Sequence, residues 1–200
     1  MTISVIMSVY RNERPEYLDE SIRSIWTDQT VKPAEIILIK DGPLADALER
    51  TISTWKERIG DRLITHSNGT NLGLTKSLNI ALRLASSDLI ARMDSDDLSD
   101  PRRFERQTAF LEANPDVAIV GGAMQEFNSS NPKLNVRHYP RNNDEVMRTI
   151  YKASPLAHPT VMMRSAIFRN GLKYDERYRT SQDIALWFDA ICAGYKIGNI

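Results

Sequence analysis

The sequence contains little cysteine and carries no excess of charge. Cys192 is the only cysteine among 200 residues, so a disulfide framework is excluded and a reducing compartment is expected. The 26 basic and 26 acidic residues balance to a net charge of zero, and they form no long block of one sign. Bulk charge therefore gives no reason to expect binding to nucleic acid.

Long hydrophobic runs are also missing. No apolar stretch approaches the roughly 20 residues that a membrane-spanning helix needs. Met1–Met7 lacks the basic region and the long apolar core of a signal peptide. Neither an internal repeat nor a low-complexity tract is present. We therefore expect residues 1–200 to form one domain, with 42% apolar residues to build its core. Tyr195–Ile200 has the pattern of a beginning strand, so we expect the chain to be truncated at this end.

Two glycine-rich nucleotide-binding motifs are absent. No G-x-G-x-x-G follows a predicted strand, which argues against a dinucleotide-dependent oxidoreductase. Arg11–Arg14, after the first predicted strand, carries charge but no glycine, whereas nucleotidyltransferases usually have a Gly-rich basic loop there.

The sequence does contain an alternation of short apolar runs with amphipathic segments. The apolar runs predict strands, and 3.6-residue spacing predicts helices between them. The strands are expected at Ile3–Tyr10, Glu35–Lys40, Leu63–His66, Leu89–Met93 and Val117–Val120. The helices are expected at Pro15–Asp28, Ala45–Ile59, Leu74–Ala85 and Pro101–Asn114. This order predicts an α/β fold with a mostly parallel central sheet flanked by helices, and a Rossmann-like N-terminal half over residues 1–122.

The pattern changes after Gly121-Gly122. Gln125–Arg141 is polar and has no clear period. Further helices are expected at Asp144–Tyr151, Ser165–Asn170 and Asp183–Ala193, with a strand at Thr160–Arg164. Residues 123–200 therefore form an added lobe rather than an independent domain.

Four carboxylates crowd into seven residues after the fourth predicted strand, in the run Asp94-Ser95-Asp96-Asp97-Leu98-Ser99-Asp100. Like charges this close either spread into water or gather a cation. Hard oxygen donors without nearby His or Cys suit Mg²⁺ or Mn²⁺, which take further oxygens from water and phosphates. The turn is thus either a solvated acidic loop or a metal–diphosphate site. Asp100, before Pro101, is expected to cap the next helix.

Six motifs in order resemble glycosyltransferase family 2, the inverting nucleotide-sugar enzymes of the GT-A fold that act in bacterial polysaccharide biosynthesis. They cover nearly the whole chain: Ile3–Tyr10, Ile39–Gly42, Asn71–Asn79, Asp94–Asp97, His158–Arg164 and Gln182-Asp183. The resemblance implies a single GT-A (nucleotide-diphospho-sugar transferase) domain, in which 1–122 is the nucleotide-binding half and 123–200 the acceptor-side lobe.

The resemblance also implies roles on the donor side. Ser8 and Tyr10 would lie against the nucleotide base, and Asp41 would accept a hydrogen bond from the base imide, favouring a UDP-sugar. Lys76 would lie near the diphosphate, and Ser95 and His158 would also bind substrate. Without the resemblance, Asp41 before Gly indicates a turn residue, Lys76 an exposed helix lysine and His158 a structural histidine.

The metal and catalytic roles follow from the same resemblance. Asp94 and Asp96 match the DxD element, with Asp96 the main ligand of Mn²⁺ or Mg²⁺, Asp94 at the ribose or metal, and Asp97 nearby. Asp183 would be the general base, although Gln182 replaces the acid that often precedes it. Without the family context, Asp183 indicates a capping residue in the first turn of a helix.

These assignments predict an enzyme, an inverting hexosyltransferase acting on a hydroxyl of a glycan or lipid-linked glycan. A sugar-phosphate nucleotidyltransferase and a non-catalytic nucleotide-sugar or glycan-binding subunit are the alternatives. We expect no nucleic-acid partner and a location in the cytoplasm, including peripheral association with the inner face of the cell membrane.

Overall fold

The computed structural model describes residues 1–127 and 135–200. The predicted irregular stretch Gln125–Arg141 falls partly on 128–134, which lie outside the described residues. The first half follows the predicted alternation: β1 (Ile3–Val9), α1 (Pro15–Trp26), β2 (Glu35–Lys40), α2 (Asp46–Ile59), β3 (Leu63–Ser67), α3 (Leu74–Leu84), β4 (Leu89–Arg92), α4 (Arg103–Ala113) and β5 (Val117–Gly121). A 3-10 turn, η1 (Gly60–Arg62), precedes β3.

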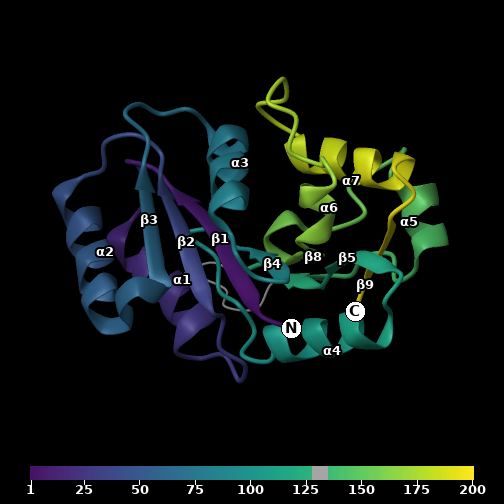
Figure 1. Ribbon diagram of the computed structural model, residues 1–200, viewed down its shortest axis with the longest axis horizontal. Coiled ribbons are helices and arrows are strands. Elements are labelled where there is room, and N and C mark those ends of the chain that lie inside the picture. Colours follow the sequence, from purple (N-terminus) through teal and green to yellow (C-terminus); the bar gives the residue numbers. More distant parts are fainter. Residues whose placement is uncertain (128–134) are drawn as a thin grey trace.

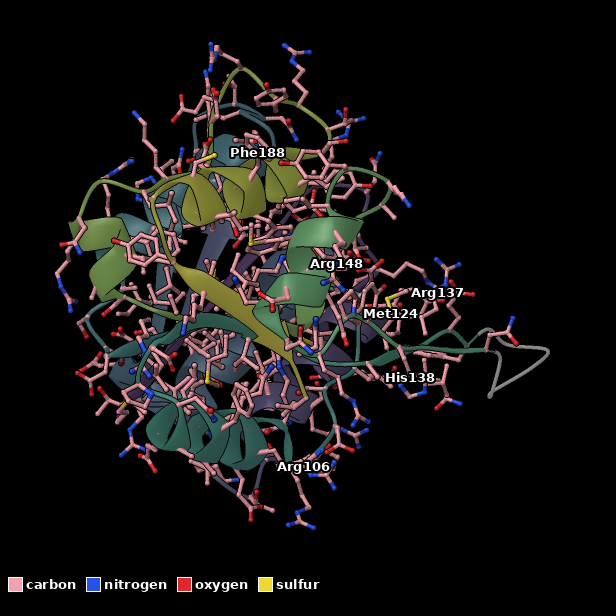
Figure 2. All side chains as sticks on the ribbon, turned by 90° about the vertical axis from the view of Figure 1, so that its right-hand side faces the viewer. Arg106, Met124, Arg137, His138, Arg148 and Phe188 are labelled. Carbon is pink, nitrogen blue, oxygen red and sulfur yellow. The ribbon has the colours of Figure 1, made fainter. Side chains whose placement is uncertain are left out.

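The second half mixes short elements with one longer helix. It comprises β6 (Met124–Gln125), β7 (Val136–Arg137), α5 (Asn143–Thr149), the 3-10 turn η2 (His158–Thr160), β8 (Met162–Arg164), α6 (Ala166–Arg169), α7 (Gln182–Cys192) and β9 (Lys196–Asn199). β6 and β7 pair as an antiparallel ladder. This ladder extends away from the body of the molecule, where Met124, Arg137 and His138 are labelled (Figure 2).

The seven-stranded sheet has the order β3-β2-β1-β4-β8-β5-β9. Strands β1 to β4 pair in parallel, as the short strand-helix links require. β8 is inserted antiparallel between β4 and β5, and β9 pairs in parallel with β5. The sheet is therefore mostly parallel, and residues 123–200 supply a strand to its middle and another to its edge.

Helices cover both faces of the sheet (Figure 1). One hydrophobic cluster joins the sheet to α1, α2 and α4 through residues such as Leu18, Leu48 and Phe104. The other joins the opposite face to α3, α5, α6 and α7, and includes Leu78 and Trp187. Strand side chains alternate between these clusters because successive residues point to opposite faces.

Helix α4 begins later than predicted. Its first residue is Arg103, and Pro101-Arg102 form a turn before it. Asp100 accepts a hydrogen bond from the Arg102 amide at 2.9 Å, and its carbonyl accepts one from the Arg103 amide at 3.0 Å. Asp100 therefore stabilises the turn before the helix, rather than capping a helix that starts at Pro101.

No helix in the described part of the chain is both long and apolar enough to cross a membrane.

Candidate active site

The predicted donor-side residues follow the carboxyl ends of β1, β2 and β4, which are neighbours in the sheet. Ser8 is on β1, and Tyr10 follows it with 46% of its surface exposed. Asp41 comes directly after β2, and Asp94–Asp97 follow β4. Because these strands are parallel, their carboxyl ends lie at one edge of the sheet, where open α/β folds bind ligands.

Asp41 is a buried carboxylate, 4% exposed, that organises the loop before α3. Its Oδ1 accepts hydrogen bonds from Asn68 Nδ2 at 2.9 Å and from the Leu72 amide at 2.8 Å. Its Oδ2 accepts one from the Gly73 amide at 2.9 Å. A carboxylate oxygen can accept two bonds, so Oδ2 keeps one lone pair for a substrate donor.

The glycine after Asp41 is required by the same loop contact. Gly42 has a φ of +90°, and a Cβ at this position would come within 2.8 Å of the Asn71 backbone nitrogen. A larger residue would push the 68–73 loop away from Asp41. Lys40, the residue before Asp41, pairs with Glu49 at 3.0 Å.

The Asp41 contacts make a stability prediction. Asp41→Asn leaves one oxygen and places an NH₂ group against backbone amides that also donate. We expect this variant to lose roughly 1–3 kcal/mol of unfolding free energy, as for other buried donors left without an acceptor. Urea denaturation checks this, with the exposed Asp61→Asn as control. An equal loss in both variants would mean that the Asp41 hydrogen bonds do not stabilise the loop.

Lys76 lies in the first turn of α3, as predicted, and its side chain is exposed. This turn adjoins the loop that Asp41 holds, so Lys76 is available to an anionic ligand at the same edge of the sheet.

The acidic turn after β4 is tied to the loop after β1. Ser95 is 5% exposed, and its hydroxyl donates to Glu13 Oε2 at 2.7 Å. The Ser21 hydroxyl of α1 donates to the Asp94 carbonyl at 2.7 Å. The Ser95 side chain is thus engaged within the protein. Glu13 is a residue that the sequence reasoning missed.

Negative charge accumulates in this turn. Desolvation raises the pKa of Asp96, and the nearby carboxylates of Asp94 and Glu13 raise it further. Burial raises the pKa of Asp97 to about 6, with added repulsion from Asp94 and Asp96. The turn therefore holds carboxylates whose ionised forms are unfavourable without a cation.

Asp94 has a cationic partner of its own. Arg92, the last residue of β4, contacts both Asp94 carboxylate oxygens through its two terminal nitrogens. Behind it, Arg103 of α4 donates to the carbonyls of Arg92 at 2.9 Å and Val161 at 3.0 Å. Neither arginine was selected by sequence motif. The signal for Arg92 is its spacing, because residues two apart on an extended strand share a face.

A divalent ion could be held in this turn by two carboxylates, but not by three. Among the residues that the structure describes, no three His, Cys, Asp or Glu side chains form a group that could hold a metal. The predicted set Asp94, Asp96 and Asp97 is therefore not assembled as a three-carboxylate site. Mg²⁺ and related ions typically use only one or two carboxylates and complete their shell with water and phosphate oxygens. The exposed Asp96 and its neighbour Asp97 match that requirement, while Arg92 occupies Asp94.

The lobe brings a second group of polar residues to the same side. His158 is 8% exposed, and its Nε2 lies 2.8 Å from the hydroxyl of the fully buried Tyr174. Its ring also packs edge-on against Trp187 of α7, with 5.9 Å between ring centroids. Burial lowers the pKa of His158 well below its ordinary value, and the charge of Arg92 lowers it further. His158 is therefore a packed, neutral side chain, and its direct contact with substrate stays a prediction.

Tyr174 is a fully buried tyrosine whose hydroxyl lies beside His158. Burial raises the pKa of its hydroxyl, Arg92 lowers it, and the negative charges of Asp183 and Asp94 both raise it. Asp183 lies in the first turn of α7 and is partly exposed. The residue before Asp183, Gln182, is 7% exposed, and its Oε1 has no hydrogen-bond partner in the described part of the chain.

The chain is similar in sequence to known glycosyltransferases. The family model described as glycosyl transferase family 2 matches residues 4–172. The chain is 30% identical over 197 residues to the amylovoran biosynthesis glycosyltransferase AmsE of Erwinia amylovora, covering 98% of this chain and 72% of that protein. It is 32% identical over 199 residues to the UDP-Gal:alpha-D-GlcNAc-diphosphoundecaprenol beta-1,3-galactosyltransferase of Escherichia coli, covering 98% and 70%.

Solved structures show the same fold at lower identity. The S. aureus TarS 1–349 complex with UDP-GlcNAc superposes with a TM-score of 0.76 at 22% identity, covering all of this chain and 56% of that one. The Pyrobaculum calidifontis mannosyltransferase PcManGT, in complex with GDP-Man and Mn²⁺, gives a TM-score of 0.73 at 16% identity, covering 99% and 54%. The chain thus spans little more than half of these solved proteins.

Proposed function

The chain belongs to glycosyltransferase family 2, and we propose that it transfers a sugar from a UDP-sugar donor to a hydroxyl of a glycan or lipid-linked glycan, with inversion at the anomeric carbon. The observation that carries this proposal is the family match over residues 4–172, on a sheet whose neighbouring strands β1, β2 and β4 are followed by Tyr10, Asp41 and Asp94–Asp97.

The donor would bind along the carboxyl ends of the parallel strands. Tyr10 is exposed and can stack on the base, and Asp41 keeps a free lone pair that can accept from the imide of uracil. Lys76 lies at the helix N-terminal turn, a position that favours anionic diphosphate. The choice of UDP is supported by the E. coli relative named for a UDP-sugar and by the TarS complex with UDP-GlcNAc.

Asp96 and Asp97 would hold a divalent ion at the diphosphate, where it would stabilise charge on the leaving group. The PcManGT complex with Mn²⁺ and the crowding of carboxylates in the turn support this assignment. Asp94, fixed by Arg92, would accept hydrogen bonds from donor hydroxyls with its remaining lone pairs.

Asp183 would act as the general base. Its carboxylate would take the proton of the acceptor hydroxyl as that oxygen attacks the anomeric carbon opposite the departing diphosphate. Tyr174 and His158 would form the buried wall behind it. The names of the E. amylovora and E. coli relatives, one an amylovoran biosynthesis enzyme and the other acting on a GlcNAc-diphosphoundecaprenol, support a role in extending a glycan on a lipid-diphosphate carrier.

Product analysis tests this function directly. Incubation with UDP-galactose, UDP-glucose or UDP-GlcNAc, Mn²⁺ and a GlcNAc-diphospholipid is expected to release UDP and to extend the lipid by one sugar. Release of pyrophosphate from UTP and a sugar phosphate would instead identify a nucleotidyltransferase. Binding of UDP-sugar without transfer, with this acceptor and with other glycan acceptors, would identify a binding subunit.

A further inference from the structure

Arg92 is a buried cation at the centre of the proposed site. It ends β4 and is 2% exposed. In the preceding residues, Ala91 belongs to the cluster under α1, α2 and α4, whereas Ile90 belongs to the cluster under α3 and α7. Alternation along the strand therefore directs the Arg92 side chain to the face where α7 and Asp183 lie.

The backbone around Arg92 is held on both sides. Its amide donates to the Val161 carbonyl at 3.0 Å, and its carbonyl accepts from Arg103 at 2.9 Å. Its side chain makes the two-point contact with Asp94, while its buried Nε has no hydrogen-bond partner among residues 1–127 and 135–200. Arg92 is thus a restrained side chain, and it pairs with Asp94, whose side chain is about one-third exposed.

The groups facing Arg92 come from several elements. Asp94, Asp96 and Asp97 follow β4, and Arg103 comes from α4. His158 and Tyr174 come from the added lobe, and the charge of Arg92 acts on both of them. Arg92 is therefore a cation between the acidic turn after β4 and the buried wall that His158 and Tyr174 form.

We propose that Arg92 is a positioning residue, which fixes the carboxylate of Asp94 so that its remaining lone pairs face the donor. This inference rests on the proposed function. A planar guanidinium that contacts both carboxylate oxygens sets direction as well as distance, which a lysine ammonium does not. Neutralising Asp94 also reduces repulsion in the turn, so that Asp96 and Asp97 keep their arrangement before substrate arrives.

A double-mutant cycle tests this role. We expect Arg92→Gln to weaken UDP binding in the presence of Mn²⁺ by about tenfold, and to lower transfer by about 100-fold, because small errors in orientation have effects of this size. In an Asp94→Asn background, Arg92→Gln should cost less than about twofold further, because the group it positions is gone. Calorimetry with UDP and Mn²⁺ measures binding, and thermal unfolding monitors the fold.

Two further variants separate positioning from charge and from stability. Arg92→Lys keeps the buried charge, so it should fold but transfer about tenfold more slowly than the wild type. Arg106→Gln removes an arginine that projects from α4 (Figure 2) and should stay within about twofold of the wild type. If Arg92→Gln does not fold, Arg92→Lys replaces it in the cycle with Asp94→Asn.

The outcomes are distinct. Equal losses from the Arg92 substitution in both backgrounds would overturn the positioning role, as would full activity of Arg92→Lys. A wild-type protein that binds no UDP with Mn²⁺ would contradict the proposed function itself. Strong coupling between Arg92 and Asp94 in UDP binding would support the inference, since a residue needed only for folding would not produce it.

Discussion

Asp183→Asn is expected to reduce sugar transfer by about 100-fold to 10,000-fold, the range that a general base typically contributes. The amide cannot take the proton from the acceptor hydroxyl, whereas the donor site at the ends of β1, β2 and β4 is unchanged. UDP binding should therefore match the wild type by calorimetry, while UDP release with acceptor present almost disappears.

Asp189→Asn is the matched control for this substitution. Asp189 lies on the same helix, is exposed, and undergoes the same change in charge and shape. Asp183 is in the first turn of α7, where a carboxylate also stabilises the helix by about 0.3–1 kcal/mol. Thermal unfolding measures that smaller effect separately. Wild-type turnover in Asp183→Asn would show that another group removes the proton.

Asp96→Asn is expected to weaken UDP binding in the presence of Mn²⁺ by at least about 100-fold, because the exposed carboxylate of the acidic turn is lost. The same substitution should leave the ligand-free protein as stable as the wild type or more stable. The pKa of Asp96 is raised by desolvation and by Asp94 and Glu13, so its ionised form opposes folding at neutral pH. Removing that charge removes the repulsion.

Thermal unfolding without ligand, and again with UDP and Mn²⁺, measures the effect of Asp96→Asn on stability and on ligand binding. The melting temperature of ligand-free Asp96→Asn should equal or exceed that of the wild type, and the increase produced by UDP and Mn²⁺ should vanish. Asp100→Asn is the control, since asparagine can accept a hydrogen bond from the Arg102 amide as aspartate does. If UDP and Mn²⁺ raised the melting temperature of Asp96→Asn as much as that of the wild type, groups other than Asp96 would have to bind the ion.

Local sequence patterns were sufficient to predict most of the elements. The run Glu35–Lys40 became β2 with the predicted bounds, and the first helix began at Pro15 as expected. These segments depend on periodicity, propensity and proline chemistry, which are properties of neighbouring residues. The resemblance to the glycosyltransferase family likewise rested on short motifs, and the family match confirmed it.

Long-range pairing decided the rest. Nothing in Met162–Arg164 indicates that β8 lies antiparallel between β4 and β5, since strand order depends on contacts between distant segments. Ser95 was selected as a substrate contact, yet its hydroxyl is engaged by Glu13, 82 residues away. Only the folded chain could show that pairing.

The sequence by itself determined that carboxylates follow buried parallel strands and that Asp183 lies in the first turn of a helix, because strand and helix ends are encoded locally. Only the tertiary structure decided that Arg92 contacts both carboxylate oxygens of Asp94, that Asp41 accepts hydrogen bonds from the loop before α3, and that the Tyr174 hydroxyl lies 2.8 Å from His158 Nε2. The reason is physical: the direction of a side chain at the end of a strand is set by what packs against it, and those partners come from elsewhere in the chain.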